Sequence, residues 1–208
     1  MIAIIDIGVG NMGAIKNMLR KVKADAIVTR DAGVLAEADK IVLPGVGAFD
    51  EGMGRLAESG LMDTLNRRVL NDRVPVLGIC LGAQMLGRSS EEGTLGGLGW
   101  IAMEAVRFPV DLGLRVPHMG WNQVHPRNDP GLFTDLTADM RFYFAHSYYL
   151  RCDDDGSVAG AATHGVNIAA AVAQDTIWGV QFHPEKSHRF GAAVLKNFAE
   201  HAGSGQRR

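Results

Sequence analysis

A cysteine stands between two glycines directly after a short apolar run. Residues 74–77 are Val-Pro-Val-Leu, and Gly78, Cys80 and Gly82 follow them at alternate positions. This order is typical of a buried strand that ends in a sharp turn and continues as a helix. The two glycines remove the Cβ clashes that such a tight bend would otherwise create. The segment therefore predicts a strand–turn–helix unit, which is the building block of an α/β fold.

Short apolar runs alternate with helical patterns through the first half of the chain. The candidate buried strands cover residues 2–6, 26–29, 40–43 and 76–79. The helical patterns cover residues 12–21, 31–38, 49–59 and 61–70. Strands that alternate with helices usually pair in parallel, so this half predicts a parallel sheet covered by helices.

The pattern changes after Trp100. Strand-like segments then follow one another with short turns, at residues 141–144, 158–163, 167–173 and 177–182. No helical pattern separates these segments, so some of them should pair antiparallel. A last helix is expected over 190–201. No repeat or long linker divides the chain, so we predict one domain over residues 1–202 and a frayed tail over 203–208.

Composition excludes several classes of protein. The formal net charge is −2, which indicates neither a basic nucleic-acid-binding patch nor an acidic tail. The chain has no apolar run of about 18 residues and no signal-peptide pattern at its start, so we expect no membrane contact. Two cysteines do not make a disulfide scaffold. A reduced, cytoplasmic protein fits these features best.

Cys80 is the first candidate for a catalytic residue. A lone cysteine after a strand is usually a small buried hydrophobe. The flanking glycines and the predicted helix favour another role, because a helix N-terminus stabilises the nucleophilic thiolate. Cys152 lies before Asp153 and Asp154 in an acidic turn, and we assign it no role.

A histidine and a glutamate follow in the sequence Phe182-His183-Pro184-Glu185. Alternate residues of an extended chain face the same side, so the imidazole and the carboxylate can lie together. The tripeptide alone is typical of a solvated turn. With Cys80 it completes a thiol, imidazole and carboxylate set for acyl transfer, in which Glu185 would fix the tautomer of His183.

Two glycine-rich turns follow predicted strands. Residues 44–47 are either an ordinary turn or a loop whose backbone N–H groups can face an oxyanion. Residues 8–13 match the dinucleotide-binding pattern G-x-G-x-x-G, and Asp31 lies near the place of a ribose-binding acid. Asp31 lies beyond the expected strand end, however, and nothing else indicates a nicotinamide enzyme. We therefore favour a strand–helix turn with Asn11 available to a partner.

The sequence does not favour a metal site. His183, Glu185 and His188 lack the spacing of a helical zinc pair, and the chain has no C-x-x-C sequence. We therefore expect neither a metal nor another cofactor.

The loop at 44–47, the cysteine turn at 78–84 and the sequence at 183–185 together resemble the motifs of class I (triad) glutamine amidotransferases. Three further stretches narrow the resemblance to glutaminase subunits of imidazole glycerol phosphate synthase, namely 116–122, 142–148 and 179–187. The resemblance runs from Met1 to about Ala199. It implies a flavodoxin-like α/β fold with a mixed, mostly parallel sheet.

The resemblance also implies a reaction, the hydrolysis of glutamine to glutamate and ammonia. Cys80 would attack the glutamine side chain, His183 would move the proton, and Glu185 would orient His183. Backbone N–H groups would hold the oxyanion, and further groups would bind the α-amino and carboxylate groups of glutamine. The residues with these two roles would be Val46, Gly47, Leu81, Gln84, His146, Ser147 and Tyr148.

A partner protein is implied because the chain has no recognisable acceptor domain. The resemblance indicates a heterodimer with a cyclase subunit of (β/α)₈ type, which would receive ammonia along a sheltered path in histidine biosynthesis. The expected docking face contains Asn11, Met12, His118, Met119, Trp121 and Asn122.

Other interpretations remain open at this point. Ala14 replaces a serine that is usual in the family, and residues 185–191 resemble a paralogous branch that serves sugar amidotransferases of surface-polysaccharide synthesis. A stand-alone hydrolase with an elbow cysteine, and a binding module with a relic site, are the alternatives from other classes.

Overall fold

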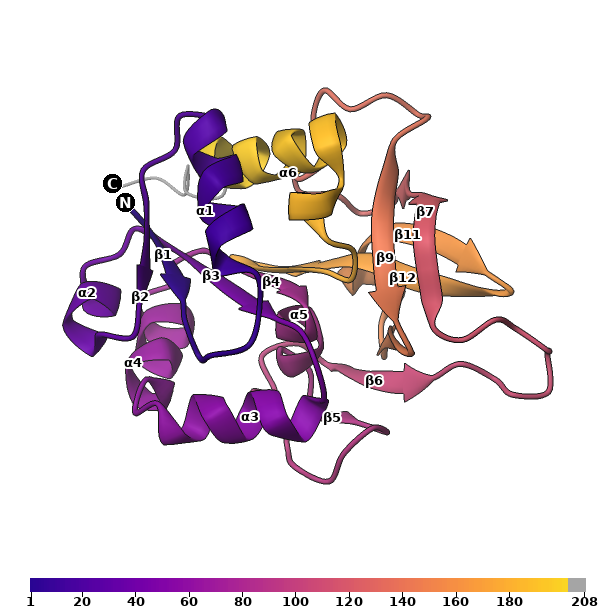
Figure 1. The fold of residues 1–208 in the computed structure, drawn as a ribbon, viewed down its shortest axis with the longest axis horizontal. Helices are drawn as coiled ribbons and strands as arrows, with labels where there is room; N and C mark the ends of the chain where they lie inside the picture. Colours follow the sequence, from indigo (N-terminus) through magenta and orange to yellow (C-terminus); the bar gives the residue numbers. More distant parts are fainter. Residues whose placement is uncertain (202–208) are drawn as a thin grey trace.

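The computed structural model describes residues 1–201, and the predicted tail at 203–208 lies outside them. Within these residues an 11-stranded mixed sheet runs through the molecule in the order β2-β1-β3-β4-β13-β12-β10-β6-β5, and β11 pairs with β12 on one side and with β8 on the other. A separate two-stranded sheet consists of β7 and β9 (Figure 1). Among the described helices, none is both long and apolar enough to cross a membrane.

The predicted parallel half is confirmed. The strands are β1 (Ile2–Ile5), β2 (Ala26–Thr29), β3 (Lys40–Gly45), β4 (Val76–Cys80) and β13 (Ile177–Val180), and they pair in parallel. The helices of this half are α1 (Met12–Lys21), α2 (Ala32–Ala36), α3 (Phe49–Glu58), α4 (Met62–Asn66) and α5 (Leu81–Met85). The central strands β1, β3, β4 and β13 are buried almost throughout, as strands of a parallel sheet covered on both faces should be, whereas the edge strand β2 is partly exposed.

The strands after Trp100 are mostly antiparallel, as predicted. They are β6 (Met103–Arg107), β10 (Tyr148–Cys152), β11 (Val158–His164) and β12 (Val166–Gln174), with the short strand β8 (His125–Pro126). The short strand β5 (Ser89–Ser90) lies before Trp100 and pairs in parallel with β6. The second sheet pairs β7 (His118–Gln123) with β9 (Arg141–His146). A short 3-10 turn, η2 (Asp155–Ser157), precedes β11.

Several helices differ from the predicted boundaries. Helix α2 is five residues long instead of the eight predicted over 31–38, and α3 ends one residue early. The helix predicted over 61–70 is split into α4 and a π-helical turn, η1 (Arg67–Asn71), whose wider winding buries Val69. The last helix, α6 (His188–His201), begins two residues earlier than predicted. Its first turn packs so closely on the 3-10 turn η3 (Pro184–Lys186) that a side chain at Gly191 would overlap the Pro184 carbonyl.

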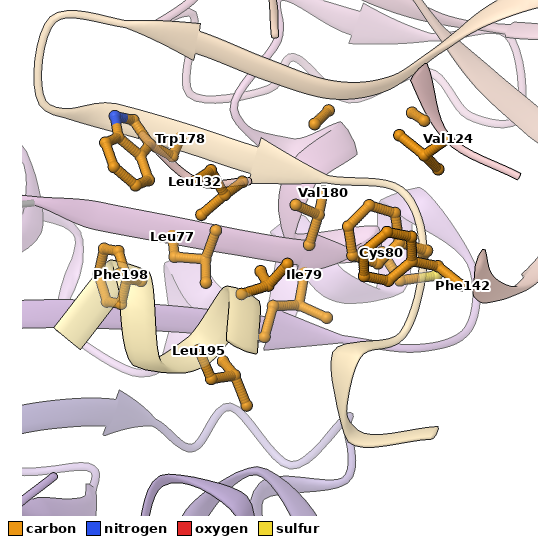
Figure 2. Close-up of a cluster of buried hydrophobic side chains, with 14 of the residues drawn as sticks. Leu77, Ile79, Cys80, Val124, Leu132, Phe142, Trp178, Val180, Leu195 and Phe198 are labelled. Carbon is orange, nitrogen blue, oxygen red and sulfur yellow. The ribbon is translucent and has the colours of Figure 1, made fainter. Parts of the chain in front are cut away.

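Hydrophobic cores lie on both faces of the sheet. Leu77 and Ile79 of β4 enter the core beneath α1 and α6, whereas Val76 enters the core beneath α2 and α3. Figure 2 shows Leu195 and Phe198 of α6 in the first of these cores, with Cys80 at the end of β4. This double burial holds β4 rigidly, so the turn that follows it has a fixed position.

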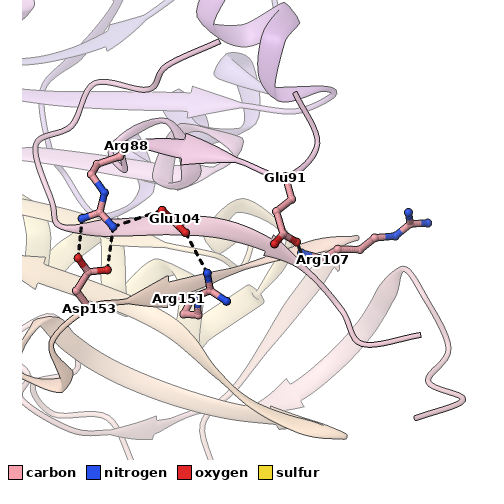
Figure 3. A network of polar contacts seen from close by, with 6 residues as sticks. All are labelled: Arg88, Glu91, Glu104, Arg107, Arg151 and Asp153. Carbon is pink, nitrogen blue, oxygen red and sulfur yellow. Dashed lines mark hydrogen bonds and ion pairs between the residues drawn. The ribbon is translucent and has the colours of Figure 1, made fainter. Parts of the chain in front are cut away.

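A network of ion pairs joins the strands at the far edge of the sheet. Arg88 forms a bidentate pair with Asp153 at 2.7 and 2.9 Å, and Arg151 contacts Glu104 at 3.0 Å (Figure 3). These side chains are partly exposed, so water screens the pairs and each contributes little to stability. Their effect is to align β6 and β10 beside the loop that follows α5.

Candidate active site

Cys80 lies at a strained bend between β4 and α5. Its backbone has φ 54° and ψ −110°, a conformation that residues with a side chain rarely adopt. A Cβ at Gly78 would lie 2.7 Å from the Gly82 carbonyl oxygen, and one at Gly82 would overlap the Leu43 carbonyl. The two glycines are therefore required by packing, and the predicted elbow is confirmed. Strain of this kind costs about 1–3 kcal/mol and is typical of functional sites.

The loop after β3 lies beside this elbow. Gly45 is paired with Cys80 in the register of β3 and β4, and a Cβ at Gly45 would lie 3.0 Å from the Gly82 nitrogen. Gly47 has φ +103°, which favours glycine. The structure thus brings Val46 and Gly47 next to the nucleophile. Leu81 opens α5, so its N–H has no partner within the helix.

His183 and Glu185 meet beside Cys80. Strand β13 pairs with β4 up to Val180 and Ile79, so the chain leaving β13 runs toward the elbow. His183 Nδ1 lies 2.9 Å from Glu185 Oε1, and the two side chains are 3% and 2% exposed. They were expected to meet on one side of an extended chain. Instead, the turn η3 folds Glu185 back onto the imidazole.

The pKa of His183 is set by opposing effects. Burial lowers it, but hydrogen bonds and charge interactions with Cys80 and Glu185 outweigh burial and raise the pKa to about 9. The protonated imidazole is therefore the stable form at neutral pH. A positively charged ring that contacts the sulfur is a suitable proton donor for an amine leaving group.

The triad base is held by a second strand, β9, through contacts that the sequence did not indicate. His183 N–H donates to the Tyr143 carbonyl at 2.8 Å, while Tyr143 N–H donates to the Ser187 hydroxyl at 2.9 Å. The same hydroxyl donates to the His183 carbonyl at 2.6 Å. Ser187 is fully buried. Sequence reasoning did not assign it a role, because these contacts depend on the position of β9.

A cleft of about 410 Å³ opens above Cys80 and His183. Every residue expected in the oxyanion and substrate sites lines it, namely Val46, Gly47, Leu81, Gln84, His146, Ser147 and Tyr148. Glu185 lies behind His183. The lining also includes Pro117, Met119, Ala145 and Lys186, and it includes Glu92, which the sequence analysis missed.

Glu92 is held at the cleft by α3. Its Oε2 accepts from Phe49 N–H at 2.9 Å, and Asp50 in turn accepts from the N–H groups of Thr94 and Leu95 at 2.9–3.0 Å. These hydrogen bonds therefore hold the Glu92 carboxylate in a defined position. The sequence does not distinguish Glu92 from the acidic residue next to it. The contact between the loop of Glu92 and Asp50 joins residues more than forty positions apart, so no local pattern predicts it.

Some of the expected docking residues are exposed and others are turned toward the interior. Asn11 is exposed, Met12 is half-buried, and Met119 and Trp121 are 63% and 47% exposed. His118, in contrast, is only 5% exposed in this chain alone, so it offers little surface to a partner. Asn122 turns its amide inward, toward the Thr163 carbonyl at 2.9 Å. Strand β7 alternates, so His118 and Asn122 lie on one face and Met119 and Trp121 lie on the other.

The glycine-rich turn at residues 8–13 joins β1 to α1. Gly8 N–H donates to Asp6, and the Asn11 side chain accepts from the Ala14 N–H at the start of the helix. Asp31 caps α2 by accepting from Gly33 N–H and Val34 N–H, so its carboxylate is already engaged. These contacts match the favoured strand–helix turn.

A larger groove of about 850 Å³ lies along β10, β11 and β12. Cys152 lines it, but burial and then the neighbouring aspartates raise the pKa of its thiol to about 11. A thiol held neutral in this way is a poor nucleophile. Among residues 1–201, no group of three or more histidine, cysteine or acidic side chains is arranged to hold a metal ion.

Comparisons with known proteins agree with this geometry. Residues 3–202 match the family described as "Glutamine amidotransferase class-I". The chain is 48% identical over 202 residues to "Imidazole glycerol phosphate synthase subunit HisH 2" of Methanococcus maripaludis, covering 97% of this chain and 100% of that protein. It is also 48% identical to a protein of the same name in Pseudomonas aeruginosa, with 96% and 99% coverage.

A chain in the structure of PurLQS from Thermotoga maritima superposes with a TM-score of 0.71 at 18% identity, covering 95% of this chain and 96% of that one. At this identity the likeness supports the fold alone. The family match and the similar sequences extend over nearly all of the chain and include the elbow and the triad segment. The chain therefore belongs to the class-I glutamine amidotransferase family.

Proposed function

We propose that this chain is the glutaminase subunit of an imidazole glycerol phosphate synthase. It would hydrolyse glutamine to glutamate and deliver ammonia to a separate cyclase subunit. The observation that carries the proposal is the meeting of Cys80, His183 and Glu185 at one cleft in a chain that is 48% identical to named subunits of that enzyme.

The chemistry follows from this arrangement. The Cys80 sulfur attacks the side-chain carbonyl carbon of glutamine, and the resulting oxyanion accepts from Leu81 N–H and from an N–H of the 46–47 loop. His183 gives its proton to the leaving nitrogen, and ammonia departs as the C–N bond breaks. His183 then takes a proton from water, which attacks the thioester, and glutamate leaves as the C–S bond breaks.

The cleft must bind both the positive α-amino group and the negative α-carboxylate group of glutamine. Both N–H groups of the Gln84 amide are used, by the Tyr148 carbonyl at 3.0 Å and by Gln181 at 3.2 Å. Gln84 therefore offers its oxygen to the cleft, which suits the α-amino group. Glu92 supplies the negative charge for the same group, and the backbone at Ser147 suits the carboxylate.

The exposed apolar side chains near the cleft mark the partner face. Met119 and Val46 line the cleft and are 63% and 40% exposed, and Trp121 lies on the same side of β7 as Met119. Apolar groups gathered at a reaction site are typical of an interaction surface. A cyclase subunit of (β/α)₈ type docked here would cover the cleft and receive ammonia before water protonates it.

One experiment tests the proposal directly. The purified chain is incubated with glutamine, with and without a cyclase subunit and its phosphoribulosyl substrate, and glutamate and imidazole glycerol phosphate are measured. We expect both products in the complete mixture and neither with the Cys80→Ala variant. Glutamate release by Cys80→Ala at the wild-type rate would overturn the triad assignment. Peptide cleavage without glutamine turnover would favour a stand-alone hydrolase.

A second acceptor is favoured by a specific observation. Residues 185–191 resemble the branch that serves sugar amidotransferases of surface-polysaccharide synthesis. The glutaminase chemistry would be the same in that branch, but the ammonia would reach a sugar. Supplying each type of partner separately and measuring which acceptor is aminated decides between the two. Either role suits the cytoplasm, where Cys80 stays reduced.

A further inference from the structure

Four buried polar side chains line or underlie the cleft without belonging to the triad. They are His118, His146, Gln84 and Gln181, with exposed fractions of 5%, 5%, 5% and 0%. They come from β7, β9, α5 and the segment after β13, yet each is hydrogen-bonded to the next member or to a shared backbone carbonyl. Buried polar groups that lose a partner are costly, so these bonds constrain one another.

Asn122 determines the direction of the bonds at one end. Its Oδ1 accepts from the Gln123 N–H at 2.8 Å, and its Nδ2 donates to the Thr163 carbonyl at 2.9 Å, which settles the amide orientation. The remaining Nδ2 hydrogen faces His118 Nε2 at 3.2 Å, so that nitrogen accepts. A neutral His118 then carries its proton on Nδ1 and donates to His146 Nε2 at 2.9 Å.

The Tyr148 carbonyl independently fixes which nitrogen of His146 donates and which accepts. The Tyr148 carbonyl can only accept, so His146 Nδ1 donates to it at 2.8 Å, and His146 Nε2 is left as an acceptor. His146 Nε2 can therefore accept the proton that His118 Nδ1 donates. Burial lowers the pKa of His118 to about 4 and that of His146 to about 3, so both rings are neutral near pH 7.

The bonds continue from the Tyr148 carbonyl to the nucleophile. Gln84 Nε2 donates both to that carbonyl and to Gln181 Oε1. Gln181 therefore turns its nitrogen toward Cys80, where Nε2 lies 3.9 Å from Sγ. An N–H group directed at sulfur stabilises negative charge on it.

We propose that two directed runs of hydrogen bonds, one through Asn122, His118 and His146 and the other through Gln84 and Gln181, meet at the Tyr148 carbonyl and form a hydrogen-bond chain that positions Cys80 and the glutamine-binding backbone according to where β7 lies. The opposite face of β7 bears Met119 and Trp121, which the proposed partner would cover. Docking would therefore act on the strand where the hydrogen-bond chain begins. This coupling rests on the proposed function, and the side chains involved are positioning residues.

The first test reads the tautomers in the folded, unmodified chain. Long-range proton–nitrogen correlation spectra at pH 7 report which ring nitrogen of each histidine carries the proton. We expect protonated Nδ1 and unprotonated Nε2 in both His118 and His146. A proton on Nε2 of either ring, or a doubly protonated ring, would overturn the proposal.

The second test compares two substitutions of His118 that differ only in which nitrogen they imitate. An asparagine amide nitrogen reaches the place of Nδ1, so His118→Asn keeps the donor to His146. Glutamine reaches the place of Nε2, so His118→Gln lacks that donor. We expect partner-stimulated kcat/KM within about threefold of wild type for His118→Asn, and a loss of about tenfold or more for His118→Gln. Equal effects of the two variants would overturn the directed chain.

His164 provides a matched control. Its ring stacks on His118 at 4.2 Å, but its Nε2 donates to the Arg115 carbonyl, outside the chain of bonds. His164→Asn therefore disturbs the packing around His118 without breaking the chain, and its kinetics should equal those of wild type. Melting temperatures of all variants report whether a loss is one of folding, and the tautomer spectra stand whatever the variants do.

The two proposals fail in different ways. If the proposed function is wrong, the wild-type chain releases no glutamate with either partner. If only the hydrogen-bond chain is wrong, the wild type is active while His118→Asn and His118→Gln behave alike.

Discussion

His183 is fixed to Tyr143 through an isolated antiparallel bridge, in which its N–H donates to the Tyr143 carbonyl at 2.8 Å. The Ser187 hydroxyl closes the other side by bonding to both backbones. The base of the triad therefore takes its position from β9, in the two-stranded sheet. Strand β13, which precedes it in the chain, only brings it near.

Loss of the Ser187 hydroxyl should reduce catalysis more than binding. Ser187→Ala leaves the Tyr143 N–H and the His183 carbonyl without their buried partner, so the imidazole loses its fixed place. We expect kcat for partner-stimulated glutamine hydrolysis to fall about tenfold, or about 1.4 kcal/mol, with KM nearly unchanged. Ser157→Ala, on an exposed turn, is the control. An unchanged kcat in Ser187→Ala would show that the bridge alone positions His183.

A methyl group at Gly82 should prevent folding. The added Cβ would overlap the Leu43 carbonyl of the central strand β3, and α5, which carries Gly82, is fixed directly at the end of β4. We expect Gly82→Ala to be insoluble or to melt far below wild type. Gly54→Ala is the matched control, because Gly54 lies in α3 with open space around its Cβ, and its melting temperature should be equal or higher. A stable, wild-type-like Gly82→Ala would contradict the close packing of β3 on α5.

Local patterns predicted the parts of the fold that depend on neighbours in the chain. The apolar runs at β1 to β4 and the glycines around Cys80 are short-range signals, and the structure confirms them. The order of β10, β12 and β6 could not be predicted, because pairing between antiparallel strands is decided by packing across the whole sheet. The same limit applies to Ser187 and Gln181, whose partners come from distant strands.

Strand β7 shows why the burial of His118 could not be predicted from the sequence. His118 and Asn122 face inward, whereas the large apolar residues Met119 and Trp121 face outward, so the usual amphipathic pattern is reversed for these four residues. Sequence reasoning grouped all of these residues as one docking face. The hydrogen bonds of His118 to His146 and Asn122 show that one face of β7 points to the interior, and its other face points to solvent.

Stability should depend on the protonation of His183. Its pKa in the folded chain is raised from 6.5 to about 9, so protonation stabilises the fold fully below pH 6.5. This stabilisation is lost as pH rises through about 9, with a slope of up to about 1.4 kcal/mol per pH unit. Cys80→Ala removes one cause of the raised pKa. Urea titrations between pH 6 and 10 should therefore show a smaller decline for Cys80→Ala, and equal declines would contradict the sulfur–imidazole contact.

Glu92 should govern the affinity for glutamine. Glu92→Gln keeps an oxygen for the Phe49 N–H but removes the charge that faces the α-amino group. We expect KM for glutamine to rise about tenfold with little change in kcat, because the carboxylate binds substrate and transition state alike. Glu91→Gln is the control, since Glu91 accepts from the Arg107 N–H outside the cleft. Equal KM values for Glu92→Gln and Glu91→Gln would remove Glu92 from the substrate site.

Trp121 should be the anchor for the partner subunit. It is 47% exposed, and its ring is held nearly parallel to that of His188 at 5.4 Å, with Tyr143 at its edge. A large aromatic ring that is already ordered loses little conformational freedom on docking, which is typical of residues that dominate interfaces.

Trp121→Ala should therefore weaken partner binding about thirtyfold or more, which corresponds to about 2 kcal/mol. Titration calorimetry with the partner subunit measures the change, and the melting temperature of the free chain reports any effect on folding. Leu70→Ala is the control, because Leu70 is 51% exposed on η1 and does not line the cleft. If both variants bound the partner as wild type does, the docking surface would have to lie away from β7, and the hydrogen-bond chain that begins there would have no link to docking.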